Sequence, residues 1–140
     1  MLRISRLADY ATVIMRDMAV IDSGISGTEI AQNTAINLPT VRKLLKQLLK
    51  AGLLVSERGI NGGYQLSKPA DQISLANIVE AIDGPLALTE CSLPTGKCAI
   101  STHCVNKDNW HVINQVVKDA LSGVSLLQMS QSLVMNKVMK

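Results

Sequence analysis

The sequence predicts a mainly α-helical fold with one small β-hairpin and a long helix near its carboxyl end. Hydrophobic residues make up 47% of the 140 residues, but aromatic residues only 2%. Aliphatic side chains must therefore fill the core, which favours helices over a β-sandwich. Apolar residues recur at helical spacing in several stretches. A glycine-rich turn between two short strand-like stretches predicts the hairpin, and the length suits one domain.

The first helix is predicted to begin after Ser5, whose side chain can cap it, and to end at about Ile21. A turn follows at residues 22–24, because Asp, Ser and Gly favour turns. Residues 28–33 are then expected to form a short helix. The first helix carries one apolar stripe, made of Leu7, Ala8, Ala11, Ile14, Met15 and Met18.

A second strongly amphipathic helix is expected after a turn at residues 34–37. Pro39 suits its first turn, because proline has no N–H to leave unpaired there. The helix runs to about Lys50, and Gly52 ends it. Its apolar residues recur at positions i, i+3, i+4 and i+7 and are expected to pack inward; they are Val41, Leu44, Leu45 and Leu48.

The predicted hairpin follows this helix directly. Its first strand starts at residues 53–55, its glycine-rich tip covers residues 59–63, and its return strand covers residues 64–66. Ser74 can then cap another helix, which ends at the Asp-Gly-Pro sequence of residues 83–85.

The last part of the chain divides into a loop and a helix. Residues 86–107 lose helical periodicity, so an irregular loop is expected. A long amphipathic helix is predicted from about Asp108. Gly123 breaks this helix, and Ser125 can cap a final short helix. The apolar face of the long helix is formed by Val112, Ile113, Val116, Val117, Ala120 and Leu121.

The order of helix, short helix, turn, basic helix and ribbon is that of a winged helix-turn-helix. Between residues 38 and 68, six Lys and Arg residues stand against one Glu, whereas the whole chain has a net charge of +3. The alternative is a merely solvated charged face, but the order of elements favours a double-stranded DNA operator as partner. The predicted DNA contacts are Pro39, Thr40, Arg42, Lys43 and Lys46 of the helix, and Arg58 and Asn61 of the wing.

Three cysteines lie close together in the loop, and the chain has no others. Cys91, Cys98 and Cys104 are separated by six and five residues, which matches neither a disulfide framework nor a zinc ribbon. Three thiolates favour an iron–sulfur cluster, with zinc or buried unmodified thiols as alternatives. An enzyme with a cysteine nucleophile is least favoured, since no Cys-His-Asn arrangement is evident. A four-iron cluster needs one more ligand, for which the candidates are Asp9, Glu90, His103 and His111.

Three stretches resemble one known family. They are LRISRLADYA at residues 2–11, RGINGGYQL at residues 58–66, and residues 73–85. They resemble the Rrf-two family, the IscR/NsrR type of bacterial iron–sulfur transcription regulator, and most of all its regulators of SUF cluster-assembly genes. The resemblance covers nearly the whole chain. It implies a homodimeric repressor whose long helix crosses its partner and whose DNA affinity depends on the cluster.

The sequence departs from the IscR type in two ways. The first cysteine gap is six residues where the family commonly has five, and Lys107 stands where the IscR type has a histidine. A protonated lysine cannot bind iron. Asp9, in contrast, matches the aspartate that NsrR-type members offer across the dimer. The resemblance therefore implies a [4Fe-4S] rather than a [2Fe-2S] cluster. Its ligands would be Cys91, Cys98, Cys104 and Asp9 of the second subunit, with His103 in reserve.

The sequence as a whole predicts an iron–sulfur-sensing repressor of cluster-assembly genes. It divides into a DNA-binding domain (1–85), a cluster loop (86–107) and a dimerisation region (108–140). The alternatives are a nitric-oxide- or iron-responsive repressor of the same family, and a cluster carrier that does not bind DNA. No window approaches the roughly 18–20 apolar residues of a membrane span. Charged residues interrupt the first helix, so neither a signal peptide nor a membrane partner is expected, and the predicted location is the cytoplasm.

Overall fold

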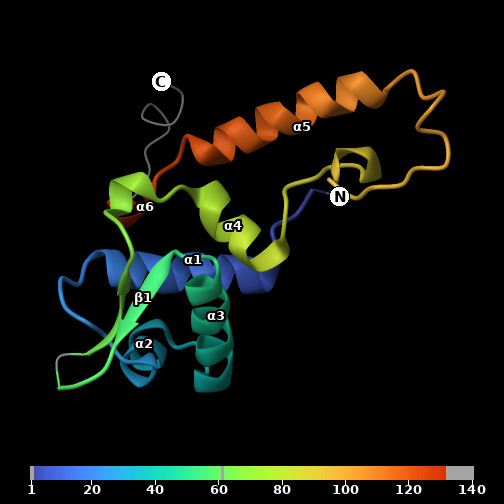
Figure 1. The fold of residues 1–140 in the computed structure, drawn as a ribbon. Coiled ribbons are helices and arrows are strands. Elements are labelled where there is room, and N and C mark those ends of the chain that lie inside the picture. Colours follow the sequence, from blue (N-terminus) through green and yellow to red (C-terminus); the bar gives the residue numbers. More distant parts are fainter. Residues whose placement is uncertain (1, 61, 132–140) are drawn as a thin grey trace.

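The computed structural model describes residues 2–60 and 62–131, and it confirms a mainly helical fold with a two-stranded hairpin (Figure 1). Asn61, a predicted DNA contact, lies outside the described residues. The elements are α1 (Arg6–Ala19), α2 (Gly27–Thr34), α3 (Leu38–Lys50), β1 (Leu54–Glu57), β2 (Gly63–Leu66), the 3-10 turn η1 (Ala70–Gln72), α4 (Leu75–Asp83), the 3-10 turn η2 (Glu90–Ser92), α5 (Lys107–Ser122) and α6 (Leu126–Ser130).

Side-chain caps begin α1, α4 and α6, as the sequence predicts, and Ser26 and Asn37 also cap α2 and α3. The Ser5 hydroxyl accepts the Ala8 N–H at 3.0 Å, and α4 and α6 begin with capping boxes at Ser74 and Ser125. The end of α1 differs from the prediction, because the helix stops at Ala19 rather than at about Ile21. The Ile21 N–H instead donates to the Met18 carbonyl at 3.2 Å, which tightens the chain into a turn.

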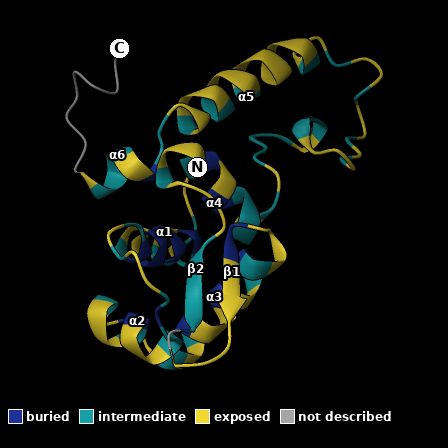
Figure 2. Cartoon of the chain, turned by 60° about the vertical axis from the view of Figure 1, so that its left-hand side comes forward, coloured by how far each residue is buried: buried dark blue, intermediate teal, exposed yellow. Residues whose placement is uncertain are grey.

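The core forms where the inner faces of the helices meet (Figure 2). All four predicted inward residues of α3 are fully buried, and the predicted apolar residues of α1 are buried apart from the half-buried Leu7. Further buried residues lie outside these two stripes, Ile73 and Leu126 among them. Ile73 precedes α4 and Leu126 begins α6, and both have an exposed fraction of 0%. The short final helix is therefore part of the core.

The hairpin is anchored to the segment between α1 and α2. Strands β1 and β2 are antiparallel, with Leu54 opposite Leu66. Beyond this pair, the Tyr64 N–H donates to the Ile25 carbonyl at 2.8 Å, and Tyr64 accepts the Ile25 N–H at 3.1 Å. Gly63 makes this approach possible. It has φ = 127°, and a Cβ there would lie 2.7 Å from the Ile25 oxygen.

Helix α5 lies at the opposite end of the molecule from the hairpin tip (Figures 1 and 2). It packs along α4, which in turn packs on α1 and α3. None of its residues is buried, and its apolar face is open to solvent, with Val112 65% and Val116 62% exposed. None of the helices in the described part of the chain is long and apolar enough to cross a membrane.

Candidate functional site

The predicted recognition helix α3 presents a basic face to solvent. Because its apolar residues are buried at i, i+3, i+4 and i+7, the basic residues between them must point outward. Arg42, Lys43 and Lys46 are exposed. Pro39 is exposed in the first turn, and the half-buried Thr40 donates its backbone N–H to the Asn37 side chain at 3.0 Å. The face therefore combines three cations with the capped amino end of the helix.

The wing lies at the same end of the molecule as the first turn of α3. Figures 1 and 2 show the hairpin tip, α2 and α3 on this side, away from α5. Arg58 is exposed at the hairpin tip. The fold thus brings the predicted contacts of the helix and Arg58 of the wing to one end of the chain. A helix and a two-stranded ribbon placed together can engage adjacent grooves of a DNA duplex.

The cysteine loop is irregular and half-buried. All three thiols are free and partly accessible. Cys91 belongs to η2, where its sulfur lies 3.1 Å from the Thr89 hydroxyl, and its carbonyl oxygen lies 3.0 Å from Nε2 of His111. Within residues 2–60 and 62–131, no three His, Cys, Asp or Glu side chains gather as a metal site. A single chain therefore does not bring the predicted cluster ligands together.

The alternative fourth ligands lie at separate places around the loop. Glu90 begins η2, His103 lies close to the third cysteine in the sequence, and His111 lies on α5; all three side chains are exposed. Of these, His111 is held at the loop by its contact with the carbonyl of Cys91.

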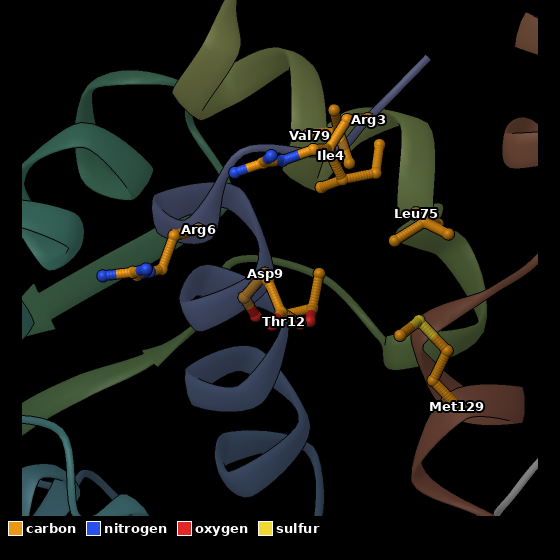
Figure 3. A pocket seen from close by; sticks show the side chains of 8 residues that line it. All are labelled: Arg3, Ile4, Arg6, Asp9, Thr12, Leu75, Val79 and Met129. Carbon is orange, nitrogen blue, oxygen red and sulfur yellow. Dashed lines mark hydrogen bonds between the residues drawn. The ribbon is translucent and has the colours of Figure 1, made fainter. Parts of the chain in front are cut away.

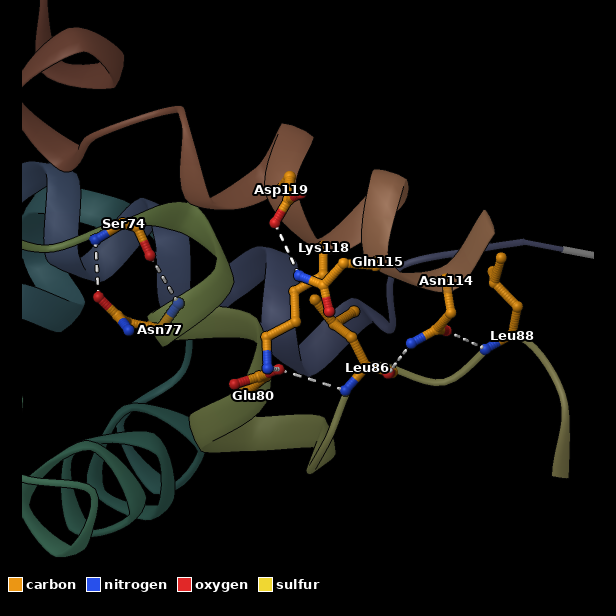
Figure 4. Close-up of polar contacts among 9 residues, drawn as sticks. All are labelled: Ser74, Asn77, Glu80, Leu86, Leu88, Asn114, Gln115, Lys118 and Asp119. Carbon is orange, nitrogen blue, oxygen red and sulfur yellow. Dashed lines mark hydrogen bonds and ion pairs between the residues drawn. The ribbon is translucent and has the colours of Figure 1, made fainter. Parts of the chain in front are cut away.

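Polar contacts fasten the beginning of the loop to α4 and α5 (Figure 4). The Asn114 side chain donates to the Leu86 carbonyl at 3.0 Å and accepts the Leu88 N–H at 2.8 Å. Glu80 of α4 accepts the Leu86 N–H at 3.4 Å and pairs with Lys118 of α5, also at 3.4 Å. We call Glu80, Asn114 and Lys118 the loop anchor. These residues could not be predicted from the sequence, because no local pattern distinguishes them from other polar helix residues.

Asp9 lies beside a cavity of about 510 Å³ at the amino end of α1 (Figure 3). Its side chain is exposed, and Arg3, Arg6 and Thr12 also line the cavity. The apolar part of the wall comes from Ile4, Leu75, Val79 and Met129. The sequence singled out Asp9 but not this cavity, which forms only when α1, α4 and α6 pack together.

The chain is similar to known transcription regulators. A model of the Rrf2 (Rrf-two) family, described as iron-dependent transcriptional regulators, matches residues 4–132. The HTH-type transcriptional regulator IscR of Vibrio vulnificus is 31% identical over 119 residues, which cover 84% of this chain and 70% of that protein.

Two solved structures have the same architecture. CymR, the global cysteine regulator of B. subtilis, matches with a TM-score of 0.74 and 28% identity, over 96% of this chain and 100% of that one. IscR of T. potens matches with a TM-score of 0.71 and 26% identity, over 93% of this chain and 87% of that one. These likenesses confirm a winged helix-turn-helix fold and a regulatory rather than enzymatic role. The chain belongs to the Rrf2 family of DNA-binding transcriptional regulators.

Proposed function

We propose that this regulator is a cytoplasmic homodimer that senses an iron–sulfur cluster and represses SUF cluster-assembly genes. Residues 1–85 form its DNA-binding domain, residues 86–107 its sensing loop, and residues 108–140 its dimerisation region. One observation carries the proposal. The loop with all three cysteines is fastened to α4 and α5 by the loop anchor, and α4 packs on both α1 and α3.

The proposed DNA surface is the outer face of α3 together with the wing. Arg42, Lys43 and Lys46 would reach bases and phosphates of the major groove. Pro39 and Thr40, at the amino end of the helix, would approach the DNA backbone. Arg58 and Asn61 would contact the adjacent minor groove or phosphates.

The proposed dimer interface is the open apolar face of α5. Val112, Ile113 and Val116 are large apolar residues with 65%, 43% and 62% exposure on one helix. Association with a second copy that covers this helix face is favourable, because it removes apolar surface from water. A dimer also suits a palindromic operator, since two recognition helices then meet two half-sites.

The donor set of the loop fits an iron–sulfur cluster by its chemistry. Three free thiols on one irregular segment are ligands that iron favours. We propose that Cys91, Cys98 and Cys104 hold a [4Fe-4S] cluster with Asp9 of the second subunit. When bound, the cluster supplies iron that reacts with oxidants and that fixes the three thiolates relative to one another. A conformational change in the loop would then be transmitted to α4 through the hydrogen bond between Glu80 and Leu86. From α4 it would be transmitted to α1 and α3, on which α4 packs.

Native mass spectrometry of anaerobically reconstituted protein tests the cofactor and the dimer together. A dimer with four irons and four sulfides per chain is expected, and Cys98→Ala or Asp9→Ala should lose or alter the cluster. Lys97→Ala, an exposed change in the same loop, should keep it. A two-iron cluster would reject the proposed ligand set. A dimer with zinc or without metal would reject the sensing mechanism and leave a metal-independent regulator.

Chromatin immunoprecipitation tests the target genes. Recovered DNA should lie upstream of cluster-assembly genes, and an operator selected from it should bind the reconstituted and metal-free proteins with different affinities. Recovered DNA from other genes only would contradict the proposed target. Equal affinities would contradict cluster sensing even if the target is right.

A further inference from the structure

A large apolar side chain is exposed to solvent at the tip of the wing. Ile60 is fully exposed, with a relative exposure of 104%, the highest among the exposed large hydrophobic residues of the described chain. An isoleucine in this position buries no surface within the chain and adds nothing to the stability of the fold. It is available to a partner that approaches the hairpin tip.

The turn holds Ile60 outward. The Gly62 N–H donates to the Gly59 carbonyl at 3.0 Å and closes the turn. Gly59 has φ = 116°, and a Cβ at Gly62 would collide with the Glu57 carbonyl. The glycines therefore let the two strands reverse tightly, and the isoleucine between them remains at the outer end of the ribbon.

The position of the tip indicates which partner it meets. Ile60 follows the exposed Arg58 by two residues, and the tip lies at the same end of the molecule as the first turn of α3 (Figures 1 and 2). The ribbon is too wide to enter a minor groove of about 6 Å as a whole, but a single side chain at its tip fits. Deoxyribose forms the apolar walls of that groove, and isoleucine is among the side chains that proteins place in it.

We propose that Ile60 enters the minor groove of the operator beside Arg58 and makes the wing selective for A·T pairs. This inference rests on the DNA-binding face proposed above and adds a specificity determinant to it. A G·C pair carries a 2-amino group on the groove floor that A·T pairs lack. Under the isoleucine side chain this donor loses its water and finds no acceptor, which disfavours binding. Arg58 contributes positive charge to DNA binding, and Ile60 discriminates A·T pairs from G·C pairs.

A base analogue tests this directly. An operator is selected from random duplex DNA with the wild-type protein, and hydroxyl-radical footprinting locates the minor groove that the wing protects. Adenines in that groove are then replaced by 2,6-diaminopurine, which adds the 2-amino group and keeps the major-groove face. Wild-type affinity, measured by fluorescence anisotropy, should fall about tenfold. The same replacement outside the wing footprint should leave it unchanged.

Variants at the tip separate Ile60 from its neighbours. The Ile60→Ser variant should bind the unmodified operator and the operator with 2,6-diaminopurine in the wing footprint with affinities within about twofold of each other. Ile60→Val should keep the difference in affinity that the wild type shows. Arg58→Ala should weaken binding to both and reduce its salt dependence, yet retain the discrimination. Because Ile60 is fully exposed, its variants should melt at the wild-type temperature, which excludes a folding defect.

Three results would overturn the proposal: no wing protection in the minor groove, an unchanged wild-type affinity for the modified operator, or full discrimination by Ile60→Ser. Failure of the DNA-binding face is distinguishable from these. In that case the wild-type protein would select no sequence, and Arg42→Ala would leave its DNA affinity unchanged.

Discussion

The side-chain oxygen of Asn114 accepts the backbone N–H of Leu88 at 2.8 Å, across 26 positions of the sequence. The same amide donates to the Leu86 carbonyl at 3.0 Å (Figure 4). Asn114 thereby pairs with the chain as a neighbouring strand would, and it holds the entrance of the cysteine loop against α5. These two hydrogen bonds connect the loop entrance directly to the helix that we propose as the dimer interface.

Replacing Asn114 should loosen the loop. Asn114→Ala removes both partly buried hydrogen bonds and should lower the free energy of unfolding by about 1–3 kcal/mol. Hydrogen exchange at the Leu88 amide should also become faster. Gln115→Ala is the matched control, because Gln115 bonds only to the exposed Asp119 side chain of its own helix, and its cost should stay below about 0.5 kcal/mol. Equal effects of the two changes would show that Asn114 does not anchor the loop.

Leu126 should be essential for stability although it lies in a five-residue helix. Its side chain is fully buried, whereas the adjacent Leu127 is 38% exposed. Leu126→Ala leaves a cavity and should cost about 2–5 kcal/mol. Leu127→Ala should cost clearly less. Urea denaturation compares the two, and a smaller effect at Leu126 than at Leu127 would contradict the packing of α6 into the core.

A charge in the apolar face of α5 should dissociate the dimer. Val116→Lys places an ammonium group where a second copy is expected to pack, and should weaken dimerisation at least about 100-fold. Ser122→Lys adds the same charge at an exposed position on another side of α5, about 120° around the helix from Val116, and should have little effect. Sedimentation equilibrium measures both constants. If Val116→Lys remains as dimeric as the wild type, another surface must form the interface.

The salt dependence of operator binding should identify the residues that neutralise phosphates. Arg42→Ala and Lys46→Ala should each lower the slope of log K against log salt concentration by about 1 for every phosphate that the variant no longer neutralises. Lys97→Ala, exposed in the cysteine loop, should leave the slope unchanged. Fluorescence anisotropy titrations between low and moderate salt give these slopes. Unchanged slopes for both α3 variants would place the DNA on another surface.

Local sequence patterns predict the elements of this fold well. Pro39 lies in the first turn of α3 as predicted, and the spacing of the apolar residues of this helix assigns its inner face before any partner is known. The same reasoning places its basic residues outside and the glycines of the wing at a turn. It misses η1 and η2, because 3-10 turns of three residues leave no periodic pattern.

The structure tests the predicted sites only in part. It leaves the basic residues of α3 and Arg58 of the wing exposed at one end of the chain, and their contact with DNA stays a prediction. The sequence also singles out the cysteines, but the structure of one chain leaves them apart. Asp9 is assigned as a ligand from a resemblance. The cavity beside it could not be predicted, because residues as far apart in the chain as Arg3 and Met129 line it.

The sequence by itself determines the helices, their caps, the inward face of α3, the basic block and the three thiols in one loop. All of these depend on residues within a few positions of one another, where helical spacing and capping act. Only the tertiary structure decides that Tyr64 pairs with Ile25, that Leu126 completes the core, and that Asn114 anchors the cysteine loop. These contacts join residues far apart in the chain, and they form only because burial of the apolar faces brings their elements together.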